Sequence, residues 1–193
     1  MNPPPARRRF LRHGLCHGAA LSAAAAAAAV GVAPALMLPA RARVAQTREL
    51  EMSHLHTREH IAVVYARADA YLPEALGSLD RFLRDHYSGA VGRIDPRLHD
   101  LLHAVRQVLD TTQPLHVISG YRAPSTNAHL KATRGGGVAT RSLHMDGRAI
   151  DVRIPGVPLA DLRDAALSLR AGGVGYYPRD RFVHLDTGRV RSW

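Results

Sequence analysis

Two short stretches near residue 50 carry the first clear pattern of hydrophobic and polar positions. In residues 48–55, Leu50 and Met52 are apolar and alternate with polar neighbours, and residues 61–65 are rich in β-branched side chains. Alternation and β-branching both favour strands. The two stretches therefore predict a pair of strands joined by a hairpin across residues 56–59.

Later stretches have apolar residues at helical spacing, and they begin with residues that favour helix starts. Residues 73–86 open with Pro73, residues 124–133 with Pro124 and residues 158–170 with Pro158. Proline is well tolerated in a first helical turn. Another helix is expected from Pro96, with Asp95 as its N-cap. Its predicted buried stripe consists of Leu98, Leu101, Leu102, Val105, Val108 and Leu109.

Four further β-prone runs follow between and after these helices, at residues 115–118, 151–154, 174–177 and 181–186. In the last of them, alternation places Phe182, His184 and Asp186 on one face. Together the elements predict one α+β domain, with a small antiparallel sheet and flanking helices. The length of 193 residues can bury a substantial core without disulfide bonds.

Two groups of histidines have spacings that metal sites also use. His54, His56 and His60 fall around the predicted hairpin, and His99 and His103 lie one helical turn apart. Neither group has a partnering ligand pattern nearby. Since histidines are common as ordinary polar residues, we interpret both groups as solvated.

A stronger candidate combines His144, Asp151 and His184. Gly147 lets the backbone turn sharply after His144, and Asp151 begins a β-prone run that can lie beside the strand of His184. Two imidazoles and a carboxylate suit zinc, and three protein ligands leave one coordination position for water, as catalytic zinc sites require. Taken singly, each histidine would more simply be structural.

Arg122 follows the predicted strand at 115–118 directly, in the sequence Ser-Gly-Tyr-Arg. Its planar fork suits a carboxylate, so we expect a clamp on a carboxylate of the substrate. The alternative is a salt bridge that only positions the loop.

Four ordered motifs run from Ile118 to Gly188. They read Ile-Ser-Gly-Tyr-Arg-x-Pro-x-Thr-Asn, Ser-Leu-His-x-x-Gly-x-Ala-Ile-Asp, Gly-Gly-Val-Gly-Tyr-Tyr-Pro and Phe-Val-His-x-Asp-Thr-Gly. This series resembles the M15 family of zinc peptidases, which holds D-Ala-D-Ala carboxypeptidases and peptidoglycan endopeptidases. The closer likeness is to the branch formerly described as a domain of unknown function, which contains a murein endopeptidase.

The resemblance implies a D-Ala-D-Ala metallopeptidase-like fold and roles for particular residues. His144, Asp151 and His184 would be zinc ligands, and Arg122 and Ser142, which matches the family's serine, would bind substrate. Where many members place a catalytic carboxylate, three residues before the last histidine, this chain has an arginine. Asp186 is then the candidate general base with Asp180 in reserve, or Asp186 orients His184.

The N-terminus predicts an export signal over residues 1–42, followed by the peptidase domain over residues 43–193. Paired arginines precede Phe10 and Leu11, then an alanine-rich apolar stretch and a small-residue cleavage site, which resembles a twin-arginine signal. The alternative is an uncleaved membrane anchor. The single cysteine, Cys16, would leave with the leader.

The net charge of the chain bears on which binding partners we expect. The leader holds five arginines and no acidic residue, so its removal takes the formal charge from +10 to +5. Export, scattered arginines and the lack of interleaved aromatic residues argue against nucleic acid. We therefore expect a periplasmic zinc peptidase that hydrolyses peptidoglycan crosslinks. The alternatives are a carboxypeptidase that trims D-alanine and a non-catalytic module that binds peptidoglycan stem peptides.

Overall fold

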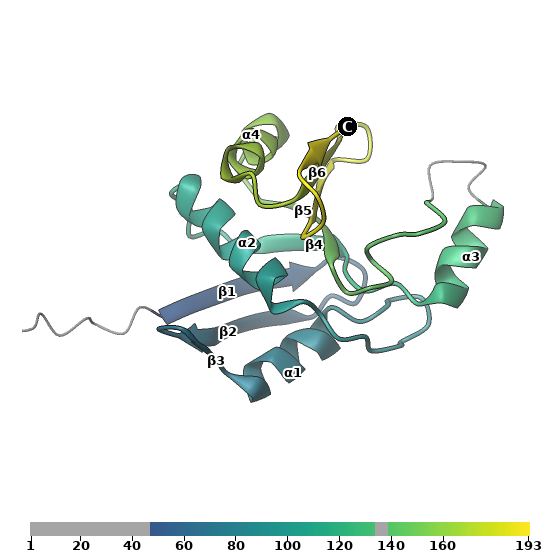
Figure 1. Ribbon diagram of the computed structural model, residues 1–193, viewed down its shortest axis with the longest axis horizontal. Helices are drawn as coiled ribbons and strands as arrows, with labels where there is room; N and C mark the ends of the chain where they lie inside the picture. Colours follow the sequence, from purple (N-terminus) through teal and green to yellow (C-terminus); the bar gives the residue numbers. More distant parts are fainter. Residues whose placement is uncertain (1–46, 134–138) are drawn as a thin grey trace, which may run out of the picture. The chain divides into compact units, whose positions relative to one another are not determined.

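The computed structural model describes residues 47–133 and 139–193. The leader predicted over residues 1–42 lies outside this part. The described residues form one eight-stranded sheet with the order β3-β2-β1-β4-β5-β7-β6-β8, together with four helices (Figure 1). None of those helices has the length and apolar character needed to cross a membrane.

Strands and helices are interspersed along the described part of the chain. The strands are β1 (Thr47–His54), β2 (His60–Arg67), β3 (Ala70–Tyr71), β4 (Leu115–Ser119), β5 (Ala149–Arg153), β6 (Gly173–Tyr177), β7 (Phe182–Asp186) and β8 (Arg191–Ser192). The helices are α1 (Pro73–Phe82), α2 (Pro96–Val108), α3 (Pro124–Thr133) and α4 (Leu159–Leu169). The predicted hairpin is confirmed, since β1 and β2 pair antiparallel.

The mixture of α and β elements is as predicted, but the expected small antiparallel sheet is wrong in two respects. The sheet has eight strands, and β1 pairs parallel with β4 while β6 pairs parallel with β8. Parallel pairing needs a long crossover. Between β1 and β4 that crossover contains α1 and α2, whose hydrophobic stripes cover the sheet.

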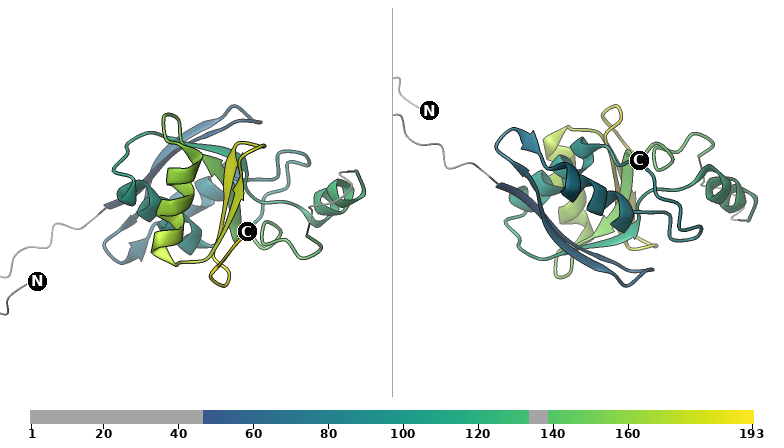
Figure 2. Two further views of the ribbon diagram at one scale, coloured as in Figure 1. Left: turned by 90° about the horizontal axis from the view of Figure 1, so that it is seen from above. Right: turned by 90° about the horizontal axis from the view of Figure 1, so that it is seen from below.

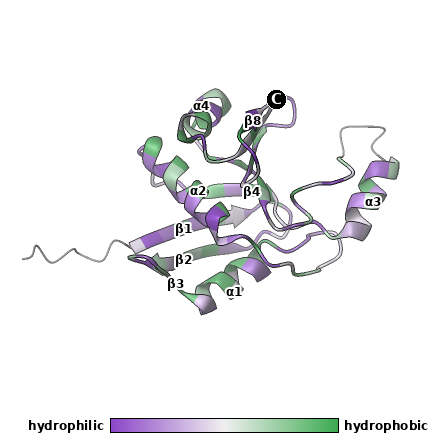
Figure 3. Ribbon diagram, in the orientation of Figure 1, coloured by the Kyte–Doolittle hydropathy of each residue, from purple (hydrophilic) through white to green (hydrophobic). Residues whose placement is uncertain are grey.

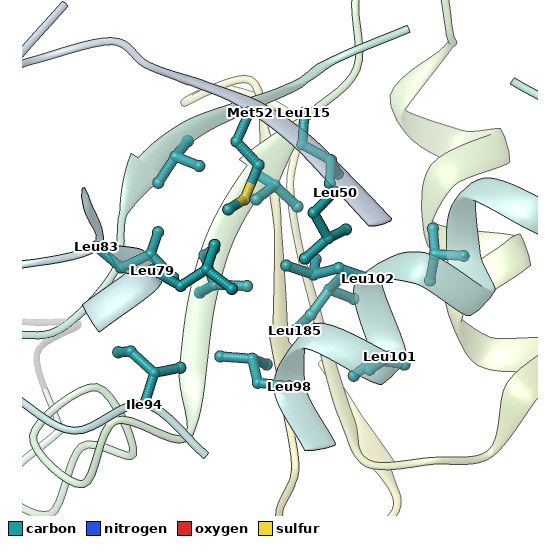
Figure 4. Packing of buried hydrophobic residues seen from close by; sticks show 14 of the residues in the cluster. Leu50, Met52, Leu79, Leu83, Ile94, Leu98, Leu101, Leu102, Leu115 and Leu185 are labelled. Atoms are coloured by element: carbon teal, nitrogen blue, oxygen red, sulfur yellow. The ribbon is translucent and has the colours of Figure 1, made fainter. Parts of the chain in front are cut away.

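One face of the sheet packs against α1, α2 and α4, which bury their apolar sides in a single core. Figure 2 shows α3 apart from this layer, and Figure 3 shows that α1 and α2 mix hydrophobic and hydrophilic residues along their length. Figure 4 shows the core from close by, with Met52 and Leu115 of the sheet near Leu79, Leu98 and Leu102 of the helices.

Strict alternation along β5 and β7 determines which residues face away from the helices. Ile150 and Val152 of β5 and Leu185 of β7 lie in the core with less than 1% exposure. Asp151 and His184 therefore project from the opposite face. The candidate site is thus built on the face of the sheet that the helices do not cover.

The predicted limits of α1 and the predicted stripe of α2 need correction. α1 ends at Phe82 and not near residue 86, because the Asp85 carboxylate accepts hydrogen bonds from the backbone N–H groups of Tyr87 and Ser88 and stabilises a turn instead. Asp95 caps α2 as expected, accepting from Arg97 N at 3.0 Å. Val108, in the last turn of α2, is 51% exposed and lies outside the core.

The interpretation of the outlying histidines as solvated is wrong for two of them. His54 lies on the buried face of β1 with Leu50 and Met52, and its Nδ1 accepts from His56 N at 3.2 Å. His99 of α2 is 0% exposed beside the Tyr65 ring, and neither of its ring nitrogens has a hydrogen-bond partner among the described residues. His56 and His60 are exposed as expected.

The buried His99 predicts a pH dependence of stability. Burial lowers its pKa from 6.5 to about 4, whereas in the unfolded chain it keeps its ordinary pKa. Between these two values the unfolded state binds more protons, so the free energy of unfolding should fall as the pH drops from about 6.5 towards 4, by up to roughly 3 kcal/mol from this residue. Urea denaturation across that range measures the slope.

A matched pair of variants assigns that slope. His99→Leu should reduce the slope without abolishing it, because burial also lowers the pKa of His54 to about 4, and His129→Gln, which changes an exposed histidine of α3, should leave it unchanged. Equal slopes for His99→Leu and the parent protein would contradict the assignment.

Candidate metal centre

The three side chains predicted as metal ligands lie together. His144, Asp151 and His184 each offer a donor atom, and these atoms all lie within 4.8 Å of one another. Asp151 of β5 is paired directly across the sheet with His184 of β7, so the strand register itself places them side by side. His144 reaches them from the turn before β5.

Gly147 forms that turn. It has a φ of +65°, and a Cβ at this position would overlap the carbonyl of Arg93. Its own carbonyl accepts from Asp95 N at 2.9 Å, which attaches the turn to the start of α2. Glycine is therefore required both for the left-handed conformation and for the close approach.

In each histidine, the ring nitrogen that faces away from Asp151 (the outer nitrogen) lies beside a hydrogen-bond acceptor. These nitrogens are Nδ1 of His144 and Nε2 of His184. His144 Nδ1 lies 2.7 Å from the carbonyl oxygen of Gly120, and His184 Nε2 lies 3.2 Å from a carboxylate oxygen of Asp186. The Gly120 carbonyl can only accept, so a neutral His144 ring carries its proton on Nδ1 and presents the lone pair of Nε2. His184 has a carboxylate oxygen at each ring nitrogen, and with its proton on Nε2 it presents the lone pair of Nδ1.

The inner nitrogens face one carboxylate. His184 Nδ1 lies 2.9 Å and His144 Nε2 lies 3.4 Å from Oδ1 of Asp151. Three acceptors then converge on one point in a buried site, an arrangement that repels itself unless a cation or a proton lies between them. The donor set and its outer-nitrogen partners fit a divalent metal ion of the zinc type.

The pKa values of Asp151 and His184 also indicate that the site favours a positive charge between the two side chains. Burial by itself would raise the pKa of Asp151, but the charges and hydrogen bonds of His144 and His184 hold it well below its usual range. Burial would lower the pKa of His184, and the two carboxylates of Asp151 and Asp186 raise it above its ordinary value. A bound cation would replace the proton that these carboxylates favour.

Asp186 is fully buried and surrounded by donors. Its Oδ1 accepts from the backbone N–H groups of Gly173 at 3.1 Å and Gly188 at 2.8 Å. Arg191 donates to both oxygens, at 3.1 and 2.7 Å. Burial would raise the pKa of Asp186, but His184, Arg191 and the backbone donors keep it far below its usual range. Its lone pairs are thus occupied in this arrangement.

A cleft of about 510 Å³ opens above the three clustered side chains. Arg122, Ser142 and Asp180, the other predicted site residues, also line it. Arg122 is half-buried and donates to Asn127 Oδ1 at 3.4 Å, while Asp180 is exposed. The cleft also contains residues that the sequence analysis did not select: His56, His86, Tyr87, Arg141, Arg191 and Trp193.

Arg122 is held beside His144 by the backbone of its own loop. Arg122 N donates to the carbonyl of His144 at 3.1 Å, and Tyr121 N donates to Leu83 O at 2.8 Å. A Cβ at Gly120 would lie 2.6 Å from the same Leu83 oxygen, so the loop passes too close to α1 for a side chain there. The loop therefore positions both Arg122, the predicted clamp, and the Gly120 carbonyl that bonds to Nδ1 of His144.

The Gly147 turn gives a prediction about stability. Gly147→Ala should lower the free energy of unfolding by more than about 3 kcal/mol, because the left-handed backbone and the overlap with Arg93 add together. Gly156→Ala is the matched control: Gly156 has a φ of +75° with no atom near the added Cβ, so its cost should be about 1 kcal/mol. Chemical denaturation measures both; equal costs would contradict the packing argument.

A helix-covered sheet that presents a His-Asp-His cluster in a cleft, with an arginine at its wall, defines an M15-type peptidase. The comparisons with known proteins agree. The sequence model described as peptidoglycan L,D-endopeptidase MepK matches residues 42–193, and the chain belongs to this family, which makes it a peptidase.

Relatives with the same description cover most of the chain. Peptidoglycan L,D-endopeptidase MepK of Escherichia coli strain K12 is 43% identical over 189 residues, which is 97% of this chain and 96% of the relative. The Shigella flexneri protein of that name has the same identity and coverage. A probable peptidoglycan L,D-endopeptidase MepK of Haemophilus influenzae is 40% identical over 147 residues, 76% of this chain and 78% of the relative.

Proposed function

We propose that this protein is a zinc-dependent peptidoglycan endopeptidase, exported to the periplasm, that cleaves an L,D peptide bond in the crosslinks between stem peptides. The observation that carries the proposal is the convergence of three potential ligand atoms, one each from His144, Asp151 and His184, on one point beneath the cleft. The relatives described as L,D-endopeptidases support the choice of substrate.

In this proposal the residues around the cleft have different roles. His144, Asp151 and His184 hold the zinc ion, which when bound polarises the scissile carbonyl and acidifies a water molecule. Arg122 binds a carboxylate of the substrate, which places the peptide bond over the site. Ser142, buried at the cleft wall, lines the path of the bound peptide.

We assign different tasks to the two candidate carboxylates. A general base must reach its proton and have a free lone pair. Asp186 is 0% exposed and its oxygens accept from Arg191, Gly173, Gly188 and His184, so its role is to orient His184. Asp180 is exposed in the cleft and is the proposed base.

The role of Arg122 gives a prediction about binding. Arg122→Lys keeps the charge but loses the fork that grips both oxygens of a carboxylate, so kcat/KM should fall about 10- to 100-fold, mainly through KM. Steady-state kinetics on a crosslinked muropeptide dimer measures it, with Arg179→Lys, an exposed residue outside the cleft, as the control. A variant with unchanged kinetics and lower stability would indicate the alternative, a salt bridge that only positions the loop.

Export follows from the proposed leader. The twin-arginine signal over residues 1–42 would deliver the folded domain, residues 43–193, to the periplasm and would then be removed. Fractionation of cells that express the full chain tests this step. Mature protein in the periplasm supports it, and full-length protein left in the membrane fraction indicates an anchor instead.

The proposed activity is tested with purified protein and muropeptide dimers of defined crosslinks, with and without a chelator. Cleavage of the crosslink that stops with the chelator and returns with zinc is the expected result. Release of D-alanine from an intact dimer would indicate a carboxypeptidase. Binding of the dimer without any product would indicate a non-catalytic module.

A further inference from the structure

The last residues of the chain lie against the metal centre, although the sequence motifs end at Gly188 and include neither Arg191 nor Trp193. We call residues 187–193 the C-terminal segment. It contains β8, which pairs parallel with β6, and beyond β8 the backbone of Trp193 bonds to β6 through Tyr176 N to Trp193 O at 3.0 Å and Trp193 N to Val174 O at 3.3 Å. These bonds bring Arg191 and Trp193 into the wall of the cleft.

Arg191 binds Asp186, the carboxylate beside Nε2 of the proposed ligand His184. Its guanidinium donates to Oδ1 and Oδ2 of Asp186, at 3.1 and 2.7 Å, and Asp186 is wholly inaccessible to solvent. Oδ2, the oxygen with the shorter bond, is also the oxygen 3.2 Å from His184 Nε2. The planar fork fixes both oxygens, and so it fixes the direction in which Asp186 faces the imidazole.

The orientation of Asp186 determines which nitrogen of His184 faces the site. With the proton of the ring on Nε2 and held by Asp186, Nδ1, which lies 2.9 Å from Asp151, offers its lone pair to a cation in the site. If Asp186 turned or lost its partner, the ring could rotate and Nδ1 would leave the position it shares with His144 and Asp151. Outer partners of this kind set the affinity of metal sites.

Trp193 packs against the same His184 ring. The indole lies 5.3 Å from the His184 ring between centroids, and the Arg191 guanidinium lies 4.7 Å from the indole centroid. Its Nε1–H donates to the Tyr177 hydroxyl at 2.7 Å, which fixes the indole in the plane it needs for this contact. Arg191, Trp193 and His184 thus pack as one group.

Two glycines of β6 leave room for this group. A Cβ at Gly175 would lie 2.7 Å from the Trp193 ring and 2.8 Å from the Tyr177 ring, and a Cβ at Gly173 would overlap both Arg191 and Asp186. Neither glycine has a positive φ. Their small size therefore serves the packing of the C-terminal segment and not a turn.

From these contacts we propose that the C-terminal segment is part of the metal centre, with Arg191 as the positioning residue for His184 through Asp186 and Trp193 as its lateral support. The inference rests on the proposed function, since it concerns the affinity of the zinc-type site. The ligand concerned is a divalent cation of borderline character, such as Zn²⁺ or Co²⁺.

The test measures metal binding and does not depend on activity. The metal-free protein is titrated with Zn²⁺ against a competing chelator, and the Co²⁺ form is followed by its visible absorption spectrum. Arg191→Met, which keeps the length of the side chain and removes the fork, should weaken Zn²⁺ binding about 10- to 100-fold and change the Co²⁺ bands. Arg189→Met, an exposed residue of the same segment, is the control and should match the parent protein.

A double variant shows whether Arg191 acts through Asp186. Asp186→Asn should weaken Zn²⁺ binding by itself, and Arg191→Met added to it should cause little further loss, because the two changes break the same connection. Equal Zn²⁺ affinity and equal Co²⁺ spectra for Arg191→Met and the parent would overturn the inference, as would fully additive losses in the double variant.

A second variant, Arg191→Lys, and the Zn²⁺ binding of the parent protein separate failure of folding and failure of the proposed function from failure of the inference. If Arg191→Met does not fold, Arg191→Lys retains the charge without the fork and should still weaken Zn²⁺ binding several-fold; unchanged affinity would overturn the inference. A parent protein that binds Zn²⁺ and cleaves dimers while the Arg191 variants bind equally well refutes only the inference. A parent protein that binds no Zn²⁺ refutes the proposed function as well.

Discussion

His144→Ala is expected to reduce hydrolysis of a crosslinked muropeptide on the order of a thousandfold or more and to remove tight zinc binding. The substitution deletes one of three proposed ligands, and the two that remain on neighbouring strands cannot enclose a cation by themselves. The measurements are kcat/KM on a defined dimer and zinc content after dialysis.

His60→Ala controls for the loss of a histidine elsewhere, because His60 is exposed on β2 and does not line the cleft. His144 also bonds to Gly120, so the thermal unfolding of the variant must be recorded beside its kinetics. A folded His144→Ala protein with ordinary activity would remove the metal centre from the mechanism.

Asp180→Asn and Asp186→Asn are expected to fail in different ways. Asp180→Asn should lower kcat by about 100- to 10,000-fold, the range for loss of a general base, while zinc affinity stays the same. Asp186→Asn should weaken zinc binding about 10- to 100-fold and retain turnover when the site is saturated with metal. Zinc titration and kinetics at saturating zinc separate the two effects.

The opposite result has a clear meaning. Loss of turnover in a zinc-saturated Asp186→Asn protein, with ordinary turnover in Asp180→Asn, would restore Asp186 as the base. The burial of Asp186 and its bonds to Arg191, Gly173 and Gly188 argue against that outcome.

Local features of the fold could be predicted because local physics determines them. The hairpin between β1 and β2 and the Asp95 cap of α2 depend on residues close together in the sequence. The insertion of β4 between β1 and β5 depends on pairs far apart in the sequence, such as Met52 with Leu115 and Val117 with Val152, and no turn or periodicity specifies it. The parallel pairing of β1 with β4 was missed for this reason.

The candidate site shows the same division. Asp151 and His184 lie in β-prone runs whose alternation places each on a defined face, so their meeting across β5 and β7 needed only the pairing of two strands. Arg191 and Trp193 were missed because β8 has two residues and its place beside β6 is a tertiary feature.

The buried histidines were misjudged for another reason. His54 continues the two-residue alternation of Leu50 and Met52, and that period was a better guide to its burial than its polarity. His99 follows the buried Leu98 in α2 and adjoins the stripe of that helix. In both cases the periodicity of the element carried more information than the type of residue.

The most direct test of the metal centre is an anomalous difference map from crystals of the zinc-loaded protein, collected at the zinc absorption edge. The account predicts one strong peak within bonding distance of His144, Asp151 and His184, with Arg122 and Asp180 facing it across the cleft. A peak at another histidine group, such as His54, His56 and His86, or no peak at these three residues, would contradict it.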